Sequence, residues 1–261
     1  MIARHLIRLT ALAVLAYLAL PLVVILGASF TATPYLAFPP QGWTLEWYRT
    51  LLVEAGYMAA FTTSTVLALA ATVAAVLLTV PAALALARYE FPGKAALTSV
   101  LMSPLVLPHI VLGAALLQFG AYFGLTRSFL SLLIGHVVII APFVLRSTLT
   151  LLTPEQRALE EASADLGASP VATFLHVTWP LTLPGVVSGA IIVFTLAVSA
   201  YVTPALLSGG RVTVLSMLIF QQYSTVFDFH YGGALSMVLL VFTLILVALA
   251  NRAATLPGAA R

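Results

Sequence analysis

The sequence contains no cysteine and very little charge. None of its 261 residues is cysteine, which excludes disulfides, thiolate nucleophiles and cysteine-ligated zinc. Asp, Glu, Lys and Arg make up only 7% of the chain, whereas soluble domains carry about 25%. Because 62% of the residues are hydrophobic, the few charges cannot cover a water-soluble surface. The composition therefore predicts a protein that resides in a lipid bilayer.

The sequence also lacks the motifs of ATP binding and of intramembrane catalysis. Lys94 is the only lysine, and a P-loop would need Gly at position 88 and Ser or Thr at 95, where Arg and Ala stand. H-E-x-x-H and G-x-S-x-G are missing, and no apolar segment holds the carboxylate pair of general acid–base catalysis. The net charge of +3 comes without a basic run. We therefore predict no enzyme, no cofactor and no nucleic-acid partner.

Six apolar segments are long enough to cross a bilayer, which takes about 20 residues of helix. The predicted spans are Leu9–Phe30, Ala59–Ala85, Leu97–Gly120, Phe129–Leu149, Leu183–Leu207 and Gly233–Ala250. The first exceeds the roughly 7–15 apolar residues of a signal peptide, so we interpret it as an uncleaved span. The predicted fold is all-α: one transmembrane domain of six helices, residues 1–261, surrounded by lipid.

Lysine and arginine are distributed unevenly over the connections between these spans. With a cytoplasmic N-terminus, eight basic residues fall inside and three outside. Those inside are Arg4, Arg8, Arg88, Lys94, Arg146, Arg157, Arg252 and Arg261, and those outside are Arg49, Arg127 and Arg211. The positive-inside rule therefore predicts that the N-terminus and the C-terminus are both cytoplasmic.

The longest connection on that side, residues 150–182, carries half of the chain's acidic residues and predicts a short helical hairpin. Thr153 suits the N-cap, Pro154 the first helical position, and Gln156 completes a capping-box pattern. Gly167 stands where a C-cap glycine would end the first helix. A second cap and proline follow at residues 169–170, and prolines 180 and 184 mark the return to the membrane.

A hairpin held between two spans presents a compact surface to the cytoplasm. Alanines at 158, 162 and 164 keep its first helix slim, and Glu160 and Glu161 offer charge to a partner. The alternative is a helix lying on lipid headgroups, but such helices favour Lys and Arg rather than acid. We therefore expect the hairpin to dock onto another protein.

The same residues carry a family motif. Glu161-Ala162-Ser163, three residues, Gly167, nine residues and then Val177-Thr178-Trp179-Pro180 resemble the EAA loop of ABC importer permeases, E-A-A-x3-G-x9-I-x-L-P. The spacing matches throughout, and the departures are Ser163, Val177 and Trp179. With phrases such as R-Y-E-F-P-G at 88–93, the resemblance to type I permeases covers most of the chain.

This resemblance implies a role for the hairpin and a set of partners. In the family the loop forms a coupling helix that seats in a groove of a separate ATPase, and that ATPase binds the ATP. The ATPase-coupling residues implied are Glu160, Glu161, Ala162, Asp165 and Gly167. The partners implied are an ATPase dimer, a second permease subunit and a periplasmic substrate-binding protein. We expect the second permease to be a different chain, so that the pair is a heterodimer.

Polar residues beside prolines in the spans are candidates for the substrate pathway, because proline frees backbone carbonyls that lipid cannot satisfy. These candidates are His109, His136, Ser199, Tyr201 and Thr203. The alternative is that the prolines are kinks and that the hydroxyls and imidazoles join helices to each other. Gly185 and Gly189 form a G-x-x-x-G that predicts helix packing rather than dimerisation.

The substrate is less well defined by the sequence. Residues 43–48 and 201–207 resemble the spermidine/putrescine branch of the family, which makes a polyamine our first expectation. Some polyamine permeases carry an acidic pair near position 200, where this chain has Ser199-Ala200-Tyr201. Aminoethylphosphonate, ferric iron and thiamine therefore stay open as substrates. The alternative class is an ion-coupled secondary transporter, for which only the histidines could serve at mid-membrane.

Overall fold

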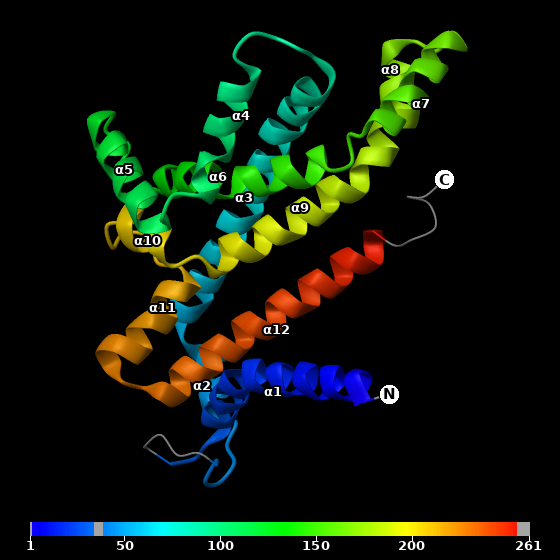
Figure 1. Cartoon of the computed structure of the whole chain (residues 1–261). Helices are drawn as coiled ribbons and strands as arrows, with labels where there is room; N and C mark the ends of the chain where they lie inside the picture. Colours follow the sequence, from blue (N-terminus) through cyan, green and yellow to red (C-terminus); the bar gives the residue numbers. More distant parts are fainter. Residues whose placement is uncertain (1, 34–38, 255–261) are drawn as a thin grey trace. The chain divides into compact units, whose positions relative to one another are not determined.

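The computed structural model describes residues 2–33 and 39–254, and these residues form helices and no strand (Figure 1). Within these described ranges, five helices are long and apolar enough to cross a membrane. They are Arg4–Phe30 within α1 (Ile2–Phe30), Ala55–Arg88 (α3), Phe129–Leu149 (α6), Pro170–Ser199, which ends in α9 (Trp179–Ser199), and Phe229–Arg252 within α12 (Phe229–Ala254). The predicted all-α membrane fold is confirmed, and the predicted span Phe129–Leu149 has the bounds of α6.

The third predicted span, Leu97–Gly120, is wrong as a single helix. The chain forms α4 (Lys94–Met102), a 3-10 turn over Ser103–Leu105 and α5 (His109–Tyr122). The two halves, Lys94–Leu105 and His109–Tyr122, are bent by 108°. Pro108 causes the break, because it lacks an amide hydrogen and disfavours helical backbone at the residue before it. Six spans result only if this bent pair counts as one.

The fifth predicted span, Leu183–Leu207, is displaced toward the N-terminus. Helix begins with α8 (Pro170–Thr173), passes through a π-helical turn over Phe174–Thr178 and continues as α9 to Ser199. Pro180 and Pro184 do not interrupt it, since the π turn lies just ahead of the first of them and changes the local hydrogen-bond pattern. Ala200 is extended, and α10 (Val202–Leu207) is a separate helix.

The chain divides into two compact units, which are described separately. The first comprises Met1–Ala60 and Met217–Phe242, and the second Phe61–Ser216 and Thr243–Arg261. In the first, the short helix α2 (Glu46–Val53) is fastened by two side-chain bonds. The Tyr48 hydroxyl donates to Ser29 Oγ at 2.8 Å, and Trp47 Nε1 donates to the Thr31 carbonyl at 3.0 Å. Burial raises the pKa of the Tyr48 phenol.

Two further contacts in the first unit involve the start of α12. The Trp47 ring stacks on His230 with centroids 5.4 Å apart, and the Tyr231 hydroxyl donates to a carboxylate oxygen of Glu54. Ahead of α12, the chain forms α11 (Leu215–Gln221) and a π-helical turn over Gln222–Val226.

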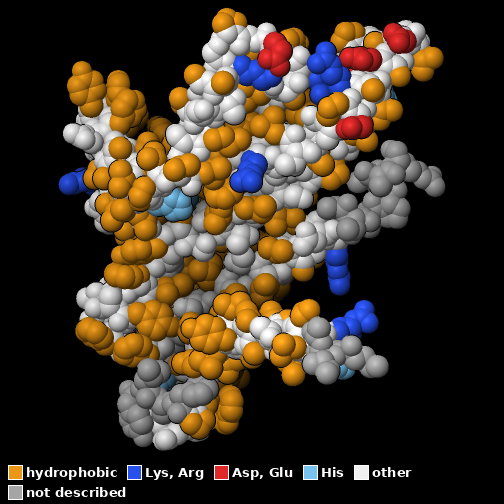
Figure 2. All heavy atoms as spheres, in the orientation of Figure 1, with side chains coloured by type: hydrophobic (Ala, Val, Ile, Leu, Met, Phe, Trp, Pro, Cys, Tyr) orange, Lys and Arg blue, Asp and Glu red, His pale blue; other side chains and the backbone are white. Residues whose placement is uncertain are grey.

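In the second unit, α6 packs closely against α9. A Cβ built on Gly189 would lie 2.2 Å from Ser147 Oγ and 3.0 Å from Val144 Cα, and one on Gly185 would lie 2.7 Å from the Ser147 carbonyl oxygen. The G-x-x-x-G pair thus packs within the chain, as the sequence predicts. In the same unit, the acidic side chains visible in Figure 2 gather near α7 (Pro154–Asp165) and near the connection between α3 and α4.

Replacing Gly189 with leucine is expected to separate α6 from α9 and to lower the yield of folded protein severely. The added side chain has no space, because helices that pack through small residues in a membrane depend on close backbone approach. Fluorescence-detected size exclusion in mild detergent measures the result. The control is Ser188→Leu, which places the same leucine side chain at an exposed position of α9. Equal yields of the two variants would contradict this packing role.

Candidate functional site

The hairpin that the sequence predicts between two spans is formed by α7 and α8. The Thr153 side chain caps α7 by accepting from the backbone N–H of Gln156 at 3.4 Å. The Ser169 side chain caps α8 in the same way, by accepting from the backbone N–H of Ala172 at 3.2 Å. Gly167 has a φ of +85° and donates to the Ala164 carbonyl at 2.9 Å. This left-handed residue turns the chain between the helices and satisfies carbonyls at the end of α7. The second arm differs from prediction because it runs on into α9.

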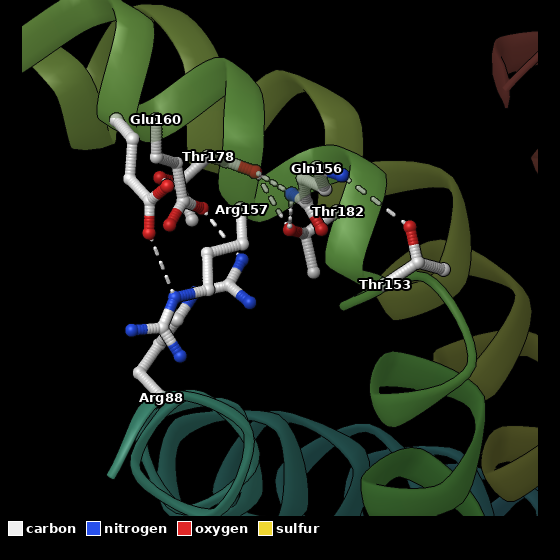
Figure 3. Close-up of polar contacts among 8 residues, drawn as sticks. Arg88, Thr153, Gln156, Arg157, Glu160, Thr178 and Thr182 are labelled. Atoms are coloured by element: carbon white, nitrogen blue, oxygen red, sulfur yellow. Dashed lines mark hydrogen bonds and ion pairs between the residues drawn. The ribbon is translucent and has the colours of Figure 1, made fainter.

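Five polar residues join the hairpin to the spans, and we call them the loop anchor: Arg88, Gln156, Glu160, Thr178 and Thr182 (Figure 3). Glu160 Oε1 accepts from Arg88 at the end of α3 at 2.7 Å and from the Thr178 hydroxyl at 2.8 Å. Gln156 Nε2 donates to the Thr178 carbonyl at 3.2 Å and to Thr182 Oγ1 at 2.9 Å. The loop anchor therefore fixes α7 to both α3 and α9.

The loop anchor corrects two interpretations of the sequence. The Glu160 side chain is only 16% exposed and its partner Arg88 15%, so this glutamate holds the hairpin in place rather than offering its charge outward. Gln156 does not complete a capping box, because its side-chain amide points inward and donates to the Thr178 carbonyl. The sequence analysis missed Arg88 and Thr178 as functional residues, because Arg88 counted only toward topology and Thr178 fell on a variable position of the motif.

The other four coupling candidates lie on the outer surface of the hairpin. Glu161 is 66% exposed and accepts from Arg157 Nε at 3.1 Å, one turn earlier on α7. Ala162, Asp165 and Gly167 are exposed as well. The structure thus places the glutamate of the motif where a partner could reach it.

An apolar groove of about 540 Å³ runs beside these residues. Its lining consists of Leu159, Ala162, Ser163, Leu166, Ala168, His176, Val177, Pro180 and Leu181. Leu166 is 90% exposed, which is unfavourable for a large apolar side chain in water unless another surface covers it. A groove with apolar walls and acidic residues on the adjoining helix is suited to binding a protein.

A second candidate site is a cavity of about 200 Å³ in the same unit. All five residues predicted for the substrate pathway line it, together with Ile139, Ile140, Phe143, Leu196, Ala200 and Val202. They are His109, His136, Ser199, Tyr201 and Thr203. The two breaks in the helices bring them together, because α5 begins at His109 after the bend and the chain turns at Ala200 before α10. None of the described residues that line the cavity is Asp, Glu, Lys or Arg.

His136 is the buried polar group of this cavity, with 2% of its surface exposed. Its Nδ1 lies 2.8 Å from the Leu132 carbonyl oxygen, and its Nε2 has no hydrogen-bond partner among the described residues. At the edge of the cavity, Ser199 Oγ donates to the Thr195 carbonyl at 2.7 Å. The site therefore combines apolar walls with a few polar atoms, as small-molecule sites do.

Apolar spans, an exposed hairpin beside an apolar groove and a small cavity at two helix breaks are features of a membrane permease. It belongs to the family of binding-protein-dependent transport system inner membrane components, whose sequence profile matches residues 79–256. The chain is accordingly a multi-pass inner-membrane permease subunit of an ABC importer and not an enzyme. The family supports this reading and not that of an ion-coupled secondary transporter.

The sequence relatives have named transport systems. The chain is 31% identical to the spermidine/putrescine transport system permease protein PotC of Haemophilus influenzae, over 91% of this chain and 92% of the relative. It is 32% identical to the putrescine transport system permease protein PotI of Escherichia coli, over 79% and 75%. Among solved structures, a chain of a bacterial ABC transporter involved in the import of the acidic polysaccharide alginate is similar to this protein. The match covers 97% of this chain and 94% of the other chain, with a TM-score of 0.73 and 15% sequence identity. That likeness shows a shared fold.

Proposed function

We propose that this chain forms half of the translocation pathway of an ABC importer for a polyamine. Its relative from H. influenzae is named for spermidine and putrescine and aligns over nine-tenths of both chains, and this is the observation that carries the proposal. A periplasmic binding protein delivers the amine and a separate ATPase dimer supplies the energy. A second, different permease subunit encloses the other half of the pathway.

The hairpin is the proposed contact with the ATPase, in a topology with both termini in the cytoplasm. Glu161 and Asp165 provide polar contacts, Ala162 allows close approach beside the apolar groove, and Gly167 forms the turn. Glu160 acts from inside, because its bonds to Arg88 and Thr178 hold α7 rigidly against the spans. Movement of the hairpin then reaches α3 and α9 directly.

The cavity lined by His109, His136, Ser199, Tyr201 and Thr203 is the proposed part of the pathway contributed by this chain. Its position at two helix breaks supports this, because irregular backbone at membrane depth is stable only inside protein or beside water.

Uptake into proteoliposomes tests the proposed function. The chain is purified with the permease and ATPase encoded beside it, reconstituted, and supplied with the neighbouring binding protein and ATP. We expect accumulation of radiolabelled putrescine or spermidine that depends on ATP and is absent without this chain. Accumulation of aminoethylphosphonate, ferric iron or thiamine instead, with no polyamine, would replace the proposed substrate. Uptake of any solute without the ATPase would contradict the proposal as a whole.

A further inference from the structure

We infer that the cavity holds an alkylammonium group of the transported amine by a hydrogen bond to His136 Nε2, using a neutral acceptor in place of a carboxylate. This inference rests on the proposed function and specifies how the pathway recognises its substrate.

The protonation of His136 follows from its backbone partner. A carbonyl oxygen can only accept, so the 2.8 Å contact with the Leu132 carbonyl places a hydrogen on Nδ1. In the neutral ring, Nε2 then carries a lone pair and is an acceptor. This atom is buried, and no described residue donates to it. Buried polar atoms are nearly always hydrogen-bonded, so Nε2 lacks a donor, and His136 lines the cavity in which a ligand could supply one.

The rest of the cavity indicates what kind of donor fits. Ser199 uses its hydroxyl hydrogen on the Thr195 carbonyl, which leaves oxygen lone pairs for a ligand. Phe143 and Tyr201 are also among the lining residues, and aromatic side chains attract cations. Ile139 and Ile140 provide apolar wall for methylene groups. Acceptors, aromatic residues and apolar walls together are complementary to an ammonium group on an alkyl chain.

The same features disfavour two of the other substrates, aminoethylphosphonate and ferric iron. An anion such as a phosphonate would meet lone pairs and no cationic side chain among the described lining residues. Imidazole sites that hold non-haem iron add a carboxylate to the histidines, and no carboxylate is among the described lining residues. A volume of about 200 Å³ is below the roughly 300–1,000 Å³ of drug-sized pockets, so the cavity admits a small amine or one end of a longer one.

A neutral acceptor also suits transit better than a fixed negative charge would. A site on a conduction path must bind well enough to admit its solute and weakly enough to release it. A buried carboxylate would bind a cation strongly and hold it, whereas an imidazole nitrogen gives one hydrogen bond. A neutral acceptor therefore accounts for the lack of an acidic pair near position 200 with a polyamine still as the substrate.

The test uses the complete importer in proteoliposomes, with putrescine as the probe. His136→Leu removes the acceptor, and His136→Gln restores one at similar reach. We expect the ratio of putrescine imported to ATP hydrolysed to fall about tenfold in the Leu variant, the loss appropriate to one hydrogen bond to a charged group. The Gln variant is expected to keep most of the wild-type ratio. If the Leu variant does not assemble, His136→Phe carries the same test.

His230→Leu is the matched control. That histidine is also buried and also has an Nε2 without a described partner, but it stacks on Trp47 in the other unit and does not line the cavity. In His230→Leu, the ratio of putrescine imported to ATP hydrolysed is expected to stay at the wild-type value. An unchanged ratio in His136→Leu, or equal losses in the Leu and Gln variants, would overturn the inference and leave His136 bound to a structural water. Failure of the wild-type importer to move any polyamine would instead refute the proposed function.

Discussion

ATP-driven uptake is expected to fall by about tenfold or more when Glu161 is replaced by lysine, a loss in keeping with reversing one charge at a protein interface. Glu161 is two-thirds exposed on α7 beside the apolar groove, so a lysine there would repel the basic groups that the acidic hairpin selects in a partner. The reversal leaves the spans untouched. The measurement is putrescine uptake by the reconstituted importer, together with co-purification of the ATPase on a tag fused to this chain.

Glu90→Lys is the matched control for this reversal. Glu90 is 90% exposed and pairs with Lys94 four residues later, just as Glu161 pairs with Arg157. Both changes therefore reverse one surface charge and remove one exposed ion pair between residues four apart. Such a pair contributes little to stability in itself. Uptake should fall only for the Glu161 variant. Wild-type uptake and normal ATPase recovery in Glu161→Lys would show that the hairpin does not dock through this residue.

The second large effect is expected at the loop anchor. Arg88→Met removes one partner of a mostly buried ion pair and leaves the Glu160 carboxylate without its counter-ion. Stranding a buried charge in this way costs about 3 kcal/mol, which corresponds to a fall of about 6 °C in the midpoint of thermal unfolding. The midpoint of the assembled importer, followed by tryptophan fluorescence, measures the change. Uptake is expected to fall as well, because α7 loses its attachment to α3.

A double substitution separates charge stranding from the loss of packing. Glu160→Gln keeps an oxygen that can accept from Thr178 while removing the negative charge. Combined with Arg88→Met, it leaves no unpaired charge, so the double variant is expected to be more stable than Arg88→Met alone. If the double variant is as unstable as the two single changes added together, the pair does not interact and the loop anchor is not held by this bond.

Helix boundaries were predictable where the local sequence alone decides them. The span Phe129–Leu149 is bounded correctly because Ser128 caps it and an apolar run of the right length follows. Prolines are the reason that two other spans were misjudged. Pro142 stays inside its helix and Pro108 lies at a break, just before α5 begins, yet the sequence shows the same residue type in each case. What differs is the packing around the freed backbone groups, which depends on residues distant in the chain.

The candidate sites, too, were predictable only where the local sequence decides the structure. The sequence located the hairpin, because caps and turns are local, but it could not tell that Glu160 faces inward and Glu161 outward. Glu160 points to an arginine 72 residues earlier, and nothing near position 160 indicates that neighbour. Likewise, each cavity residue was a candidate by itself, while their convergence depends on a 108° bend that composition does not encode.

The helix from Pro170 to Ser199 is continuous through its π-helical turn and connects the hairpin with the cavity. Its 30 residues correspond to a rod about 45 Å long. One end belongs to the hairpin, and the other, Ser199, lines the cavity. Because a helix bends far less readily than it tilts, a rotation of about 5° at one end moves the other by about 4 Å, roughly the width of an alkyl chain. Under the proposed coupling, a small swing at the hairpin is therefore enough to change the width of the cavity at Ser199.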